Sequence, residues 1–425
     1  FVNGKSRIDQ KLCIKCGKCK DACSYQAIIK FTRPCQEACG MHAIGQDEHG
    51  RADIDYDKCV NCGMCLVNCP FGAIVDKGQL FQLIHAIKKG DKVVAIIAPA
   101  FWGQFGDNVT PGQIREAMKL LGFDSLVEVA IGADLCAIEE AEEFLRDVPE
   151  KQPFMATSCC PAWVKYLENE NPKYLKNIST CKSPMEMVGA IFRDKYAAKD
   201  AADGRTTYHI AIMPCTAKKM EAARPEFVHD GRPDVDLVLT TREVIDMMQE
   251  TGIQLSELEL ESPDMPFGLG SGAAIIYGTS GGVAEAVFRH CLPDKSKNAL
   301  REISILGLRG DAPIKEASVT VGDAELKIAV VNGLANAKKL LKDIDEGKAF
   351  YHLIEVMTCQ GGCVGGAGQP YGLKKRKEKR GDGLHLSDNA AMFKRAERNP
   401  VVAQMMAEYG EERCHELLHV SYTNK

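Results

Sequence analysis

The chain has 425 residues, of which 45% are hydrophobic and 26% charged, and its formal net charge at pH 7 is −5. This length allows two or three domains around large cores, and the acidic balance gives no indication of a nucleic-acid partner. No apolar run reaches the roughly eighteen residues of a membrane span, so we expect no contact with a membrane. The N-terminus at Phe1 lacks an apolar signal core, and we expect it to be the edge of a longer chain.

Cysteine is the informative residue type. The chain contains 19 cysteines, and ten of them precede residue 70. Their spacings are those of metal ligands rather than of a disulfide framework. We therefore expect a reducing environment and a cytoplasmic location.

Two cysteine runs dominate residues 1–80, and each reads C-x2-C-x2-C-x3-C. The first run is Cys13, Cys16, Cys19 and Cys23, and the second is Cys59, Cys62, Cys65 and Cys69, with Pro70 following. This is the bacterial ferredoxin pattern, in which three close thiolates hold one [4Fe–4S] cube and the fourth reaches the other cube. The rule predicts that Cys69 completes the first cluster and that Cys23 completes the second.

Structural zinc also uses paired cysteines. Two complete runs and the trailing proline favour iron–sulfur clusters over zinc. We therefore predict a small α+β, ferredoxin-like electron-relay domain over residues 1–80. Its stability should come largely from the clusters themselves.

A shorter repeat, C-x3-C-x3-Ala-Ile, starts at Cys19, at Cys35 and at Cys65. The middle copy supplies only Cys35 and Cys39, and two thiols cannot complete a cube. They could be relics of a lost cluster, supplementary ligands for an extra centre, or a reactive pair. An inert pair is the favoured interpretation.

Helices and strands alternate after residue 80. Hydrophobic periodicity predicts helices over residues 80–89, 111–121, 133–146 and 241–250. Apolar, β-branched runs predict strands over residues 92–98, 126–131, 153–157, 208–213, 235–239, 303–308, 326–331 and 350–357. The alternation predicts an α/β catalytic domain over residues 81–425, with mostly parallel sheets flanked by helices.

Several notable residues directly follow predicted strands: Pro99, the pair Cys159–Cys160, Cys215 and Cys359. Sites in parallel sheets gather beyond the carboxyl ends of strands, so we expect these residues to share one cavity. Side chains of adjacent residues diverge, so one of the paired cysteines should be a ligand and the other a free thiol. Four further cysteines read as small buried apolar residues: Cys136, Cys181, Cys291 and Cys414.

Three stretches carry a family resemblance. TSCCPAW from Thr157, MPCTAKK from Met213 and EVMTCQGGCVGGAGQP from Glu355 resemble the three signature motifs of [FeFe]-hydrogenases. The resemblance covers essentially the whole chain. It implies an H-cluster, which is a [4Fe–4S] cube joined by a cysteine sulfur to a two-iron unit carrying CO, cyanide and an azadithiolate. The implied cube ligands are Cys160, Cys215, Cys359 and Cys363, with Cys363 as the bridging thiolate.

The resemblance also implies contacts to the two-iron unit. Lys218 would hydrogen-bond a cyanide, and Met213 and Met357 would pack around the unit. Pro99, Ala100 and Pro214 would line the cavity. The alternatives are a surface lysine and ordinary core methionines.

A proton relay follows from the same resemblance. Cys159 would be the proton donor, because a thiol with a pKa near ~8.5 can relay a proton near neutrality. Glu140, Glu143 and Ser179 would continue the relay, and the two acids share a helix face. Glu139 and Glu142 are competing choices, and a solvated helix face is the alternative for each glutamate.

The expected function is reversible reduction of protons to H2, with ferredoxin or a similar small carrier as electron partner and with maturation proteins supplying the two-iron unit. The basic run at 374–380 should be a solvated loop, or else a steering site for an acidic carrier. The rival functions are a hydrogen sensor, a subunit of an electron-bifurcating complex, and an iron–sulfur assembly protein without the two-iron unit. The joint presence of Cys159, Lys218 and the glycines after Cys363 favours the full cofactor.

Overall fold

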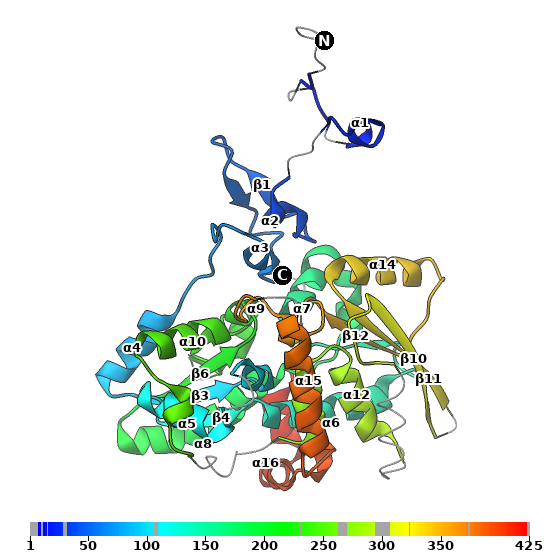
Figure 1. Ribbon diagram of the computed structural model, residues 1–425. Helices are drawn as coiled ribbons and strands as arrows, with labels where there is room; N and C mark the ends of the chain where they lie inside the picture. The colour runs from blue at the N-terminus through cyan, green and yellow to red at the C-terminus, as the bar shows by residue number, and fades with distance from the viewer. Residues whose placement is uncertain are drawn as a thin grey trace.

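The computed structural model describes residues 7–9, 12–14, 16–28, 32–105, 109–229, 231–261, 270–293, 307–322, 324–372 and 375–422. Figure 1 shows a large body made by the later part of the chain, with the N-terminal residues extending away from it. Within the described ranges, every helix is too short or too polar to cross a bilayer. Most of the strand predicted at 303–308 lies outside the described residues.

The first of two four-stranded sheets is entirely parallel. Its order is β4 (Ser125–Glu128), β3 (Lys92–Ile97), β6 (Thr207–Met213) and β9 (Leu237–Thr240). One face packs on α4 (Leu80–Lys89), α5 (Pro111–Leu120) and α10 (Thr241–Glu250), and the other packs on α6 (Ala130–Asp147) and α8 (Pro184–Asp203). Because both faces are covered, these strands are continuous apolar runs, which is why the sequence predicts them well.

The second sheet is mixed. Its order is β10 (Ile314–Val321), β11 (Ala324–Asn332), β12 (Leu353–Met357) and β5 (Met155–Ala156). Only β10 and β11 are antiparallel. Helices α7 (Pro161–Glu170) and α14 (Leu334–Asp345) cover one face, and α12 (Gly282–Cys291) covers the other. The predicted α/β class with mostly parallel sheets is confirmed.

Two strand predictions need correction. The strand expected at 126–131 ends at Glu128, and α6 begins at Ala130, where the chain turns back to cover the sheet. Strand β10 was not predicted. It lies at the edge of its sheet and alternates buried and exposed residues, so charged Lys315 and Glu316 break the apolar run.

The remaining elements are short or peripheral. The N-terminal segment holds α1 (Lys18–Asp21), α2 (Pro34–Glu37), β1 (Ile44–Gln46), β2 (Ala52–Ile54) and α3 (Met64–Val67). Later come α9 (Ala217–Glu221), β7 (Val228–His229), β8 (Arg232–Pro233), α11 (Gly272–Ile275), α15 (Lys375–Ala390) and α16 (Pro400–Leu418). Single 3-10 turns are η1 (Pro99–Gln104), η2 (Pro172–Asn177), η3 (Pro225–Phe227), η4 (Leu255–Glu257), η5 (Ile276–Gly278), η6 (Cys363–Gly365) and η7 (Ala396–Arg398).

The N-terminal segment divides into two parts. Met41, Ala43 and Val60 join the hydrophobic cluster around Trp163 and Leu334, so the part containing α2 and α3 is docked on the large body. Helix α1 buries none of its residues and lies apart from α3 (Figure 1). The domain boundary at residue 80 stays a prediction.

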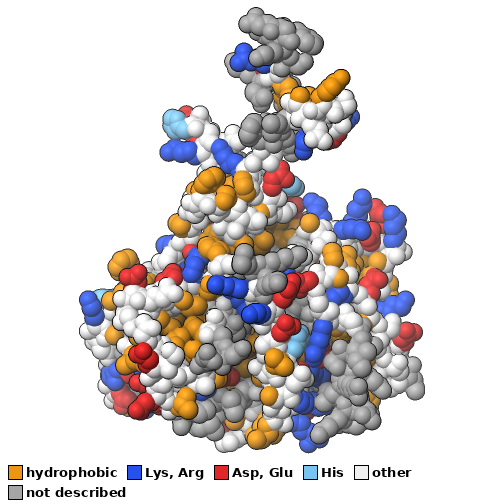
Figure 2. All heavy atoms as spheres, in the orientation of Figure 1, with side chains coloured by type: hydrophobic (Ala, Val, Ile, Leu, Met, Phe, Trp, Pro, Cys, Tyr) orange, Lys and Arg blue, Asp and Glu red, His pale blue; other side chains and the backbone are white. Residues whose placement is uncertain are grey.

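The N-terminal segment has little apolar core of its own. Leu12, Ile14, Tyr25 and Phe71 are all more than 80% exposed, and apolar side chains gather on the surface of this segment in Figure 2. Helices α1 to α3 together bury only Cys35 and Leu66. Apart from the residues that pack on the large body, this segment therefore gains little order from apolar burial, in keeping with the predicted role of the clusters.

The basic run does not form the expected solvated loop. Lys375–Arg380 opens α15, while Lys374 lies outside the described residues. The buried Arg380 guanidinium donates to the Gln104 side chain and to the Val364 carbonyl, and Lys377 pairs with Asp311. Arg380 and Lys377 therefore bind other residues of the large body, which weakens the interpretation that the basic run steers an acidic carrier.

Gly132 sets how closely α6 can approach α8. A Cβ at this position would lie 2.2 Å from the Pro184 carbonyl oxygen and 2.6 Å from Val188 Cγ2. Gly132→Ala should therefore force the helices apart and cost about 1–3 kcal/mol. We expect a lower melting temperature in a thermal scan by circular dichroism.

The matched control is Gly383→Ala in α15, where nothing lies within 4 Å of the added Cβ. Alanine favours a helix over glycine by up to about 1 kcal/mol, so this variant should melt at the same temperature or slightly higher. Equal melting temperatures for the two variants would show that the α6–α8 approach is not tight.

Candidate active site

Four strand ends meet at one cavity between the two sheets. Strand β3 leads into Pro99 and β6 into Cys215, both from the first sheet. In the second sheet, β5 leads toward Cys159 and β12 leads into Cys359. All of these residues line the same cavity, which confirms the predicted convergence.

The four candidate cube ligands lie around this cavity: Cys160, Cys215, Cys359 and Cys363. Burial, followed by the neighbouring thiols of the group, raises the pKa of Cys215 to about 11 and that of Cys363 to about 12. Four half-buried sulfur donors around one cavity are the donor set of a metal cluster, because bound iron compensates the charge of thiolates. The residues present therefore fit a [4Fe–4S] cube.

Glycines let the loop after β12 pack directly on the loop after β6. A Cβ on Gly366 would lie 2.1 Å from the Pro214 carbonyl oxygen. Gly362 has a φ of 86°, and a Cβ there would lie 2.6 Å from the Ser280 amide nitrogen. No larger residue could bring Cys363 so close to the backbone that carries Cys215.

Lys218 is buried at the cavity wall and is not a surface lysine. Its Nζ donates to Glu221 Oε2 at 2.6 Å and lies 3.4 Å from the Cys159 carbonyl oxygen. Burial alone would lower the pKa of Lys218, but the Glu221 carboxylate outweighs burial and raises it. The lysine therefore presents a permanent cation to the cavity, suited to a small anion.

The other predicted wall residues also line the cavity: Pro99, Ala100, Met213, Pro214 and Met357. Ala100, Met213 and Met357 are buried. Sequence reasoning missed Tyr277, which lines the same cavity and lies beside Cys136, Glu140 and Cys159. Tyr277 does not follow a predicted strand and belongs to no recognisable motif, so no sequence pattern could have identified it.

Helix α6 directs the two predicted relay acids inward. Glu140 and Glu143 are buried, whereas Glu142 is exposed and Glu139 half-buried, so the helix register favours the predicted pair. Ser179 Oγ donates to Glu143 Oε2 at 2.8 Å. Glu140 lies beside Ser179, but neither carboxyl oxygen of Glu140 has a hydrogen-bond partner among the described groups.

Glu140 and Glu143 differ in the groups that surround their carboxyl oxygens. Burial, followed by the neighbouring Glu143 carboxyl group, raises the pKa of Glu140 to about 8. Glu143 instead accepts hydrogen bonds from Ser179 and from both the amide and the hydroxyl of Thr180. Glu140 can thus hold or release a proton near neutral pH, while Glu143 is fixed in place.

Cys159 departs from the expected titration. Burial raises the pKa of its thiol well above the usual range, and the Glu140 charge is the next cause. The expectation of an almost unperturbed thiol is therefore wrong. Cys159 is held as a neutral S–H, which is the form that can donate a proton.

A polar chain that the sequence did not reveal continues from Glu143. Thr180 Oγ1 lies 2.8 Å from His419 Nδ1, and His419 Nε2 lies 3.2 Å from Glu139 Oε2. Thr180 and His419 are separated by 239 residues, so no local pattern could pair them. The side chain of Glu139 is 14% exposed, so the chain ends close to solvent.

Comparison with known proteins identifies the family. The model of the iron-only hydrogenase large subunit, C-terminal domain, matches residues 91–367. A 4Fe–4S binding domain matches residues 5–28 and 51–74, and the iron hydrogenase small subunit matches residues 374–425. The chain belongs to the iron-only hydrogenase family.

Similar proteins agree with this assignment. The chain is 38% identical over 370 residues to the NADP-reducing hydrogenase subunit HndD of Solidesulfovibrio fructosivorans, covering 82% of this chain and 63% of HndD. It is 36% identical over 449 residues to iron hydrogenase 1 of Clostridium pasteurianum, covering 99% of this chain and 77% of that protein. The match thus spans less than two thirds of HndD.

A solved structure shares the fold. The structure of HydA(deltaEFG), which reports stepwise [FeFe]-hydrogenase H-cluster assembly, superposes with a TM-score of 0.68 at 31% identity. The superposition covers 82% of this chain and 99% of that one. Cytosolic iron-sulfur assembly component 3 of Pongo abelii is also similar, at 32% identity over 282 residues, covering 63% of this chain and 58% of that protein.

The raised pKa of Glu140 makes the stability of this protein depend on pH. The unfolded glutamate titrates near ~4.5 and the buried one at about 8, so the folded state binds more protons between these values. The free energy of unfolding should therefore fall as pH rises from ~4.5 to 8, by up to about 1.4 kcal/mol per pH unit. Glu140→Gln should flatten this decline in anaerobic thermal melts.

Glu142→Gln is the control, on the exposed face of the same helix. It should leave most of the slope in place. An unchanged slope in Glu140→Gln would mean that Glu140 does not carry the proton in the folded state.

Proposed function

We propose that this chain catalyses the reversible reaction of two protons and two electrons to give H2, at an H-cluster held by Cys160, Cys215, Cys359 and Cys363. The observation that carries the proposal is the meeting of four sulfur donors with one additional thiol, Cys159, that is backed by a buried acid. The family assignment supports the same conclusion. When bound, the H-cluster supplies the electrons and the site at which the H–H bond forms or breaks.

The protein side chains would position this cofactor and exclude water. Lys218 would hold a cyanide ligand through its fixed ammonium group. Met213, Met357 and Ala100 would close the cavity with apolar surface, so that charged groups inside it act at low dielectric. Met213 and Met357 also belong to the large hydrophobic core, so they serve both packing and site.

Protons would move along a chain of side chains that leads outward. Cys159 S–H would give up its proton inside the cavity and be reprotonated from Glu140, its buried acidic neighbour. Ser179 and Glu143 come next, followed by Thr180, His419 and Glu139 near the surface. Each of these groups can both accept and donate a proton.

Electrons would enter through two [4Fe–4S] clusters in the N-terminal segment, which come in addition to the H-cluster. Ferredoxin or a similar small carrier would deliver them, and maturation proteins would install the two-iron unit. We place the protein in the cytoplasm, where thiols stay reduced. The similarity to an assembly component makes infrared absorption the discriminating measurement, because bands of iron-bound CO and cyanide require the two-iron unit.

Cys159→Ala should abolish H2 evolution from a reduced mediator while leaving the iron content unchanged. The thiol is the group next to both the cavity and Glu140, and general acid–base steps are worth about 10²–10⁴-fold in rate. Gas chromatography of H2 and iron analysis on the same matured sample provide the two readings.

Cys291→Ala is the control, because Cys291 is buried in a different core cluster. It should retain activity. Full activity in Cys159→Ala would rule out this proton route.

His419→Ala should slow H2 evolution, by roughly 10- to 100-fold, because it breaks the chain between Thr180 and Glu139. Added imidazole should restore part of the rate if the ring carries protons, whereas a purely structural ring would not be replaced in this way.

His415→Ala is the matched control, since His415 is exposed and stacks on His419 with ring centroids 4.4 Å apart. It should keep the parent rate. Parent activity in His419→Ala would place the proton entrance elsewhere.

A further inference from the structure

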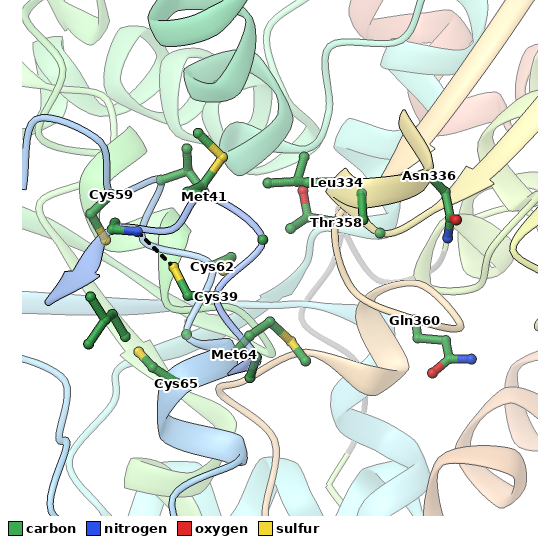
Figure 3. A pocket seen from close by; sticks show the side chains of 18 of the residues that line it. Cys39, Met41, Cys59, Cys62, Met64, Cys65, Leu334, Asn336, Thr358 and Gln360 are labelled. Atoms are coloured by element: carbon green, nitrogen blue, oxygen red, sulfur yellow. Dashed lines mark hydrogen bonds between the residues drawn. The ribbon is translucent and has the colours of Figure 1, made fainter. Parts of the chain in front are cut away.

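A second cavity lies where the N-terminal segment docks on the large body. Its volume is about 330 Å³, and four of the residues that line it are Cys39, Cys59, Cys62 and Cys65. Figure 3 shows these four side chains grouped at one end of the pocket. Cys23, the expected partner of the last three, does not line it.

We propose that Cys39, and not Cys23, is the fourth ligand of the [4Fe–4S] cluster held by Cys59, Cys62 and Cys65. The inference rests on the iron–sulfur content proposed above, but not on hydrogenase activity. The family model of the 4Fe–4S domain does not assign it, because that model matches residues 5–28 and 51–74 and passes over Cys39.

Cys39 has the local conformation of a cluster-binding cysteine. Helices α2 and α3 correspond, with Cys35 and Cys65 at their second residues. The Ala43 amide donates to Cys39 Sγ at 3.3 Å, and the Ala73 amide donates to Cys69 Sγ at the same distance. Hydrogen bonds to the sulfur are a general feature of iron–sulfur ligands.

The β1–β2 hairpin brings Cys39 close to Cys59, Cys62 and Cys65. Strand β1 pairs with β2, with Ile44 opposite Ile54, and the Asp55 amide donates to the Ala43 carbonyl at 2.8 Å. This hairpin returns the chain, so that Cys39 before it and Cys59 after it lie together. The Cys39 thiol is within electrostatic range of Cys59, Cys62 and Cys65.

Cys23 has the same kind of loop, because its sulfur also accepts from the amide four residues on, that of Ala27. Its position is what differs. It ends α1, which lies apart from α3 in Figure 1, whereas α2 and α3 are in contact. Tertiary placement, and not the spacing rule, therefore selects Cys39.

The four sulfurs suit a cluster better than a single ion. Across the described ranges, one group of acidic, histidine or cysteine side chains is close enough to hold a single ion, and it is Glu143, Cys181 and His419. The four cysteines of the docking cavity are spread more widely than that. A cube of four irons, each bound by one thiolate, needs such a spread.

The location gives this cluster a role. Thr358 lines both this cavity and the candidate active site, and Cys62 is an electrostatic neighbour of Cys359. Thr216 Oγ1 donates to the Asn61 carbonyl at 2.8 Å, which fixes the cysteine loop against the loop of Cys215. A cluster here would be the one that exchanges electrons with the cube of the active site.

The test uses the full matured chain and its single variants, prepared without oxygen. The readings are iron and sulfide per chain and the electron paramagnetic resonance spectrum after dithionite reduction. Cys39→Ala and Cys62→Ala should each lose the same cluster signal or convert it to a three-iron form. The double variant of Cys39→Ala and Cys62→Ala should lose no more iron than Cys62→Ala alone.

Cys23→Ala supplies the decisive contrast. It should keep the cluster signal that Cys39→Ala and Cys62→Ala lose, because Cys23 is not a ligand of that cluster. Cys35→Ala, which changes a buried thiol on the neighbouring helix α2, should keep the signal lost in Cys39→Ala. An unchanged iron content and spectrum in Cys39→Ala would overturn the proposal, and so would loss of the same cluster signal in Cys23→Ala.

Infrared bands of CO and cyanide in each variant report separately on the large body. Their presence beside a lost N-terminal signal would show that Cys39→Ala has not simply unfolded the protein, and would support the proposal.

If Cys39→Ala loses these bands too, the variant Cys39→Ser tests whether Cys39 is a ligand. A hydroxyl ligand should retain the cluster with a shifted spectrum, whereas a spectrum identical to the parent would overturn the assignment. Absent bands in the parent would count against the proposed function and leave the cluster readings valid.

Discussion

The charge balance of one buried cavity governs the rest of the structure. Four thiols reach it from loops in both sheets, and burial together with the neighbouring thiols raises the pKa of Cys363 to about 12, which disfavours an uncompensated thiolate there. The only cation on its wall among the described residues, Lys218, is already paired with Glu221. Iron bound at the proposed cluster would compensate the charge of the thiolates. It would also link the two sheets, because Cys215 and Cys359 belong to different ones.

Helix α6 serves both sides of this arrangement. Its N-terminal half packs against the first sheet, while Phe144 meets Phe288 in the core beneath the second. The inward face between these contacts carries Glu140 and Glu143. Glu143 accepts hydrogen bonds from Ser179 and Thr180 and is fixed in place, whereas burial raises the pKa of Glu140 to about 8, so that Glu140 can hold a proton. One helix thus supplies a fixed carboxyl group and a movable proton.

The sequence allows prediction wherever one local rule decides the outcome. Buried parallel strands are continuous apolar runs, and helical periodicity directs Glu140 and Glu143 to one face. Prediction fails where contacts between distant segments decide. The pairing of Thr180 with His419, the helix that contains the basic run and the edge strand β10 all depend on neighbours that spacing does not reveal. The high pKa of Cys159 is likewise an effect of burial, which its sequence position does not express.

The cysteine repeats show this limit most clearly. Three copies of one short pattern adopt the same turn, with positive φ at Gln26, His42 and Gly72. Local sequence therefore makes Cys23, Cys39 and Cys69 equally able to bind iron. Docking then separates them, because Met41 of the middle copy is buried against the large body, whereas α1 buries none of its residues. The N-terminal segment has little apolar core of its own, so the docking of this segment also determines which cysteine binds the cluster. The copy that packs beside the active site is the copy whose thiol can complete the cluster there.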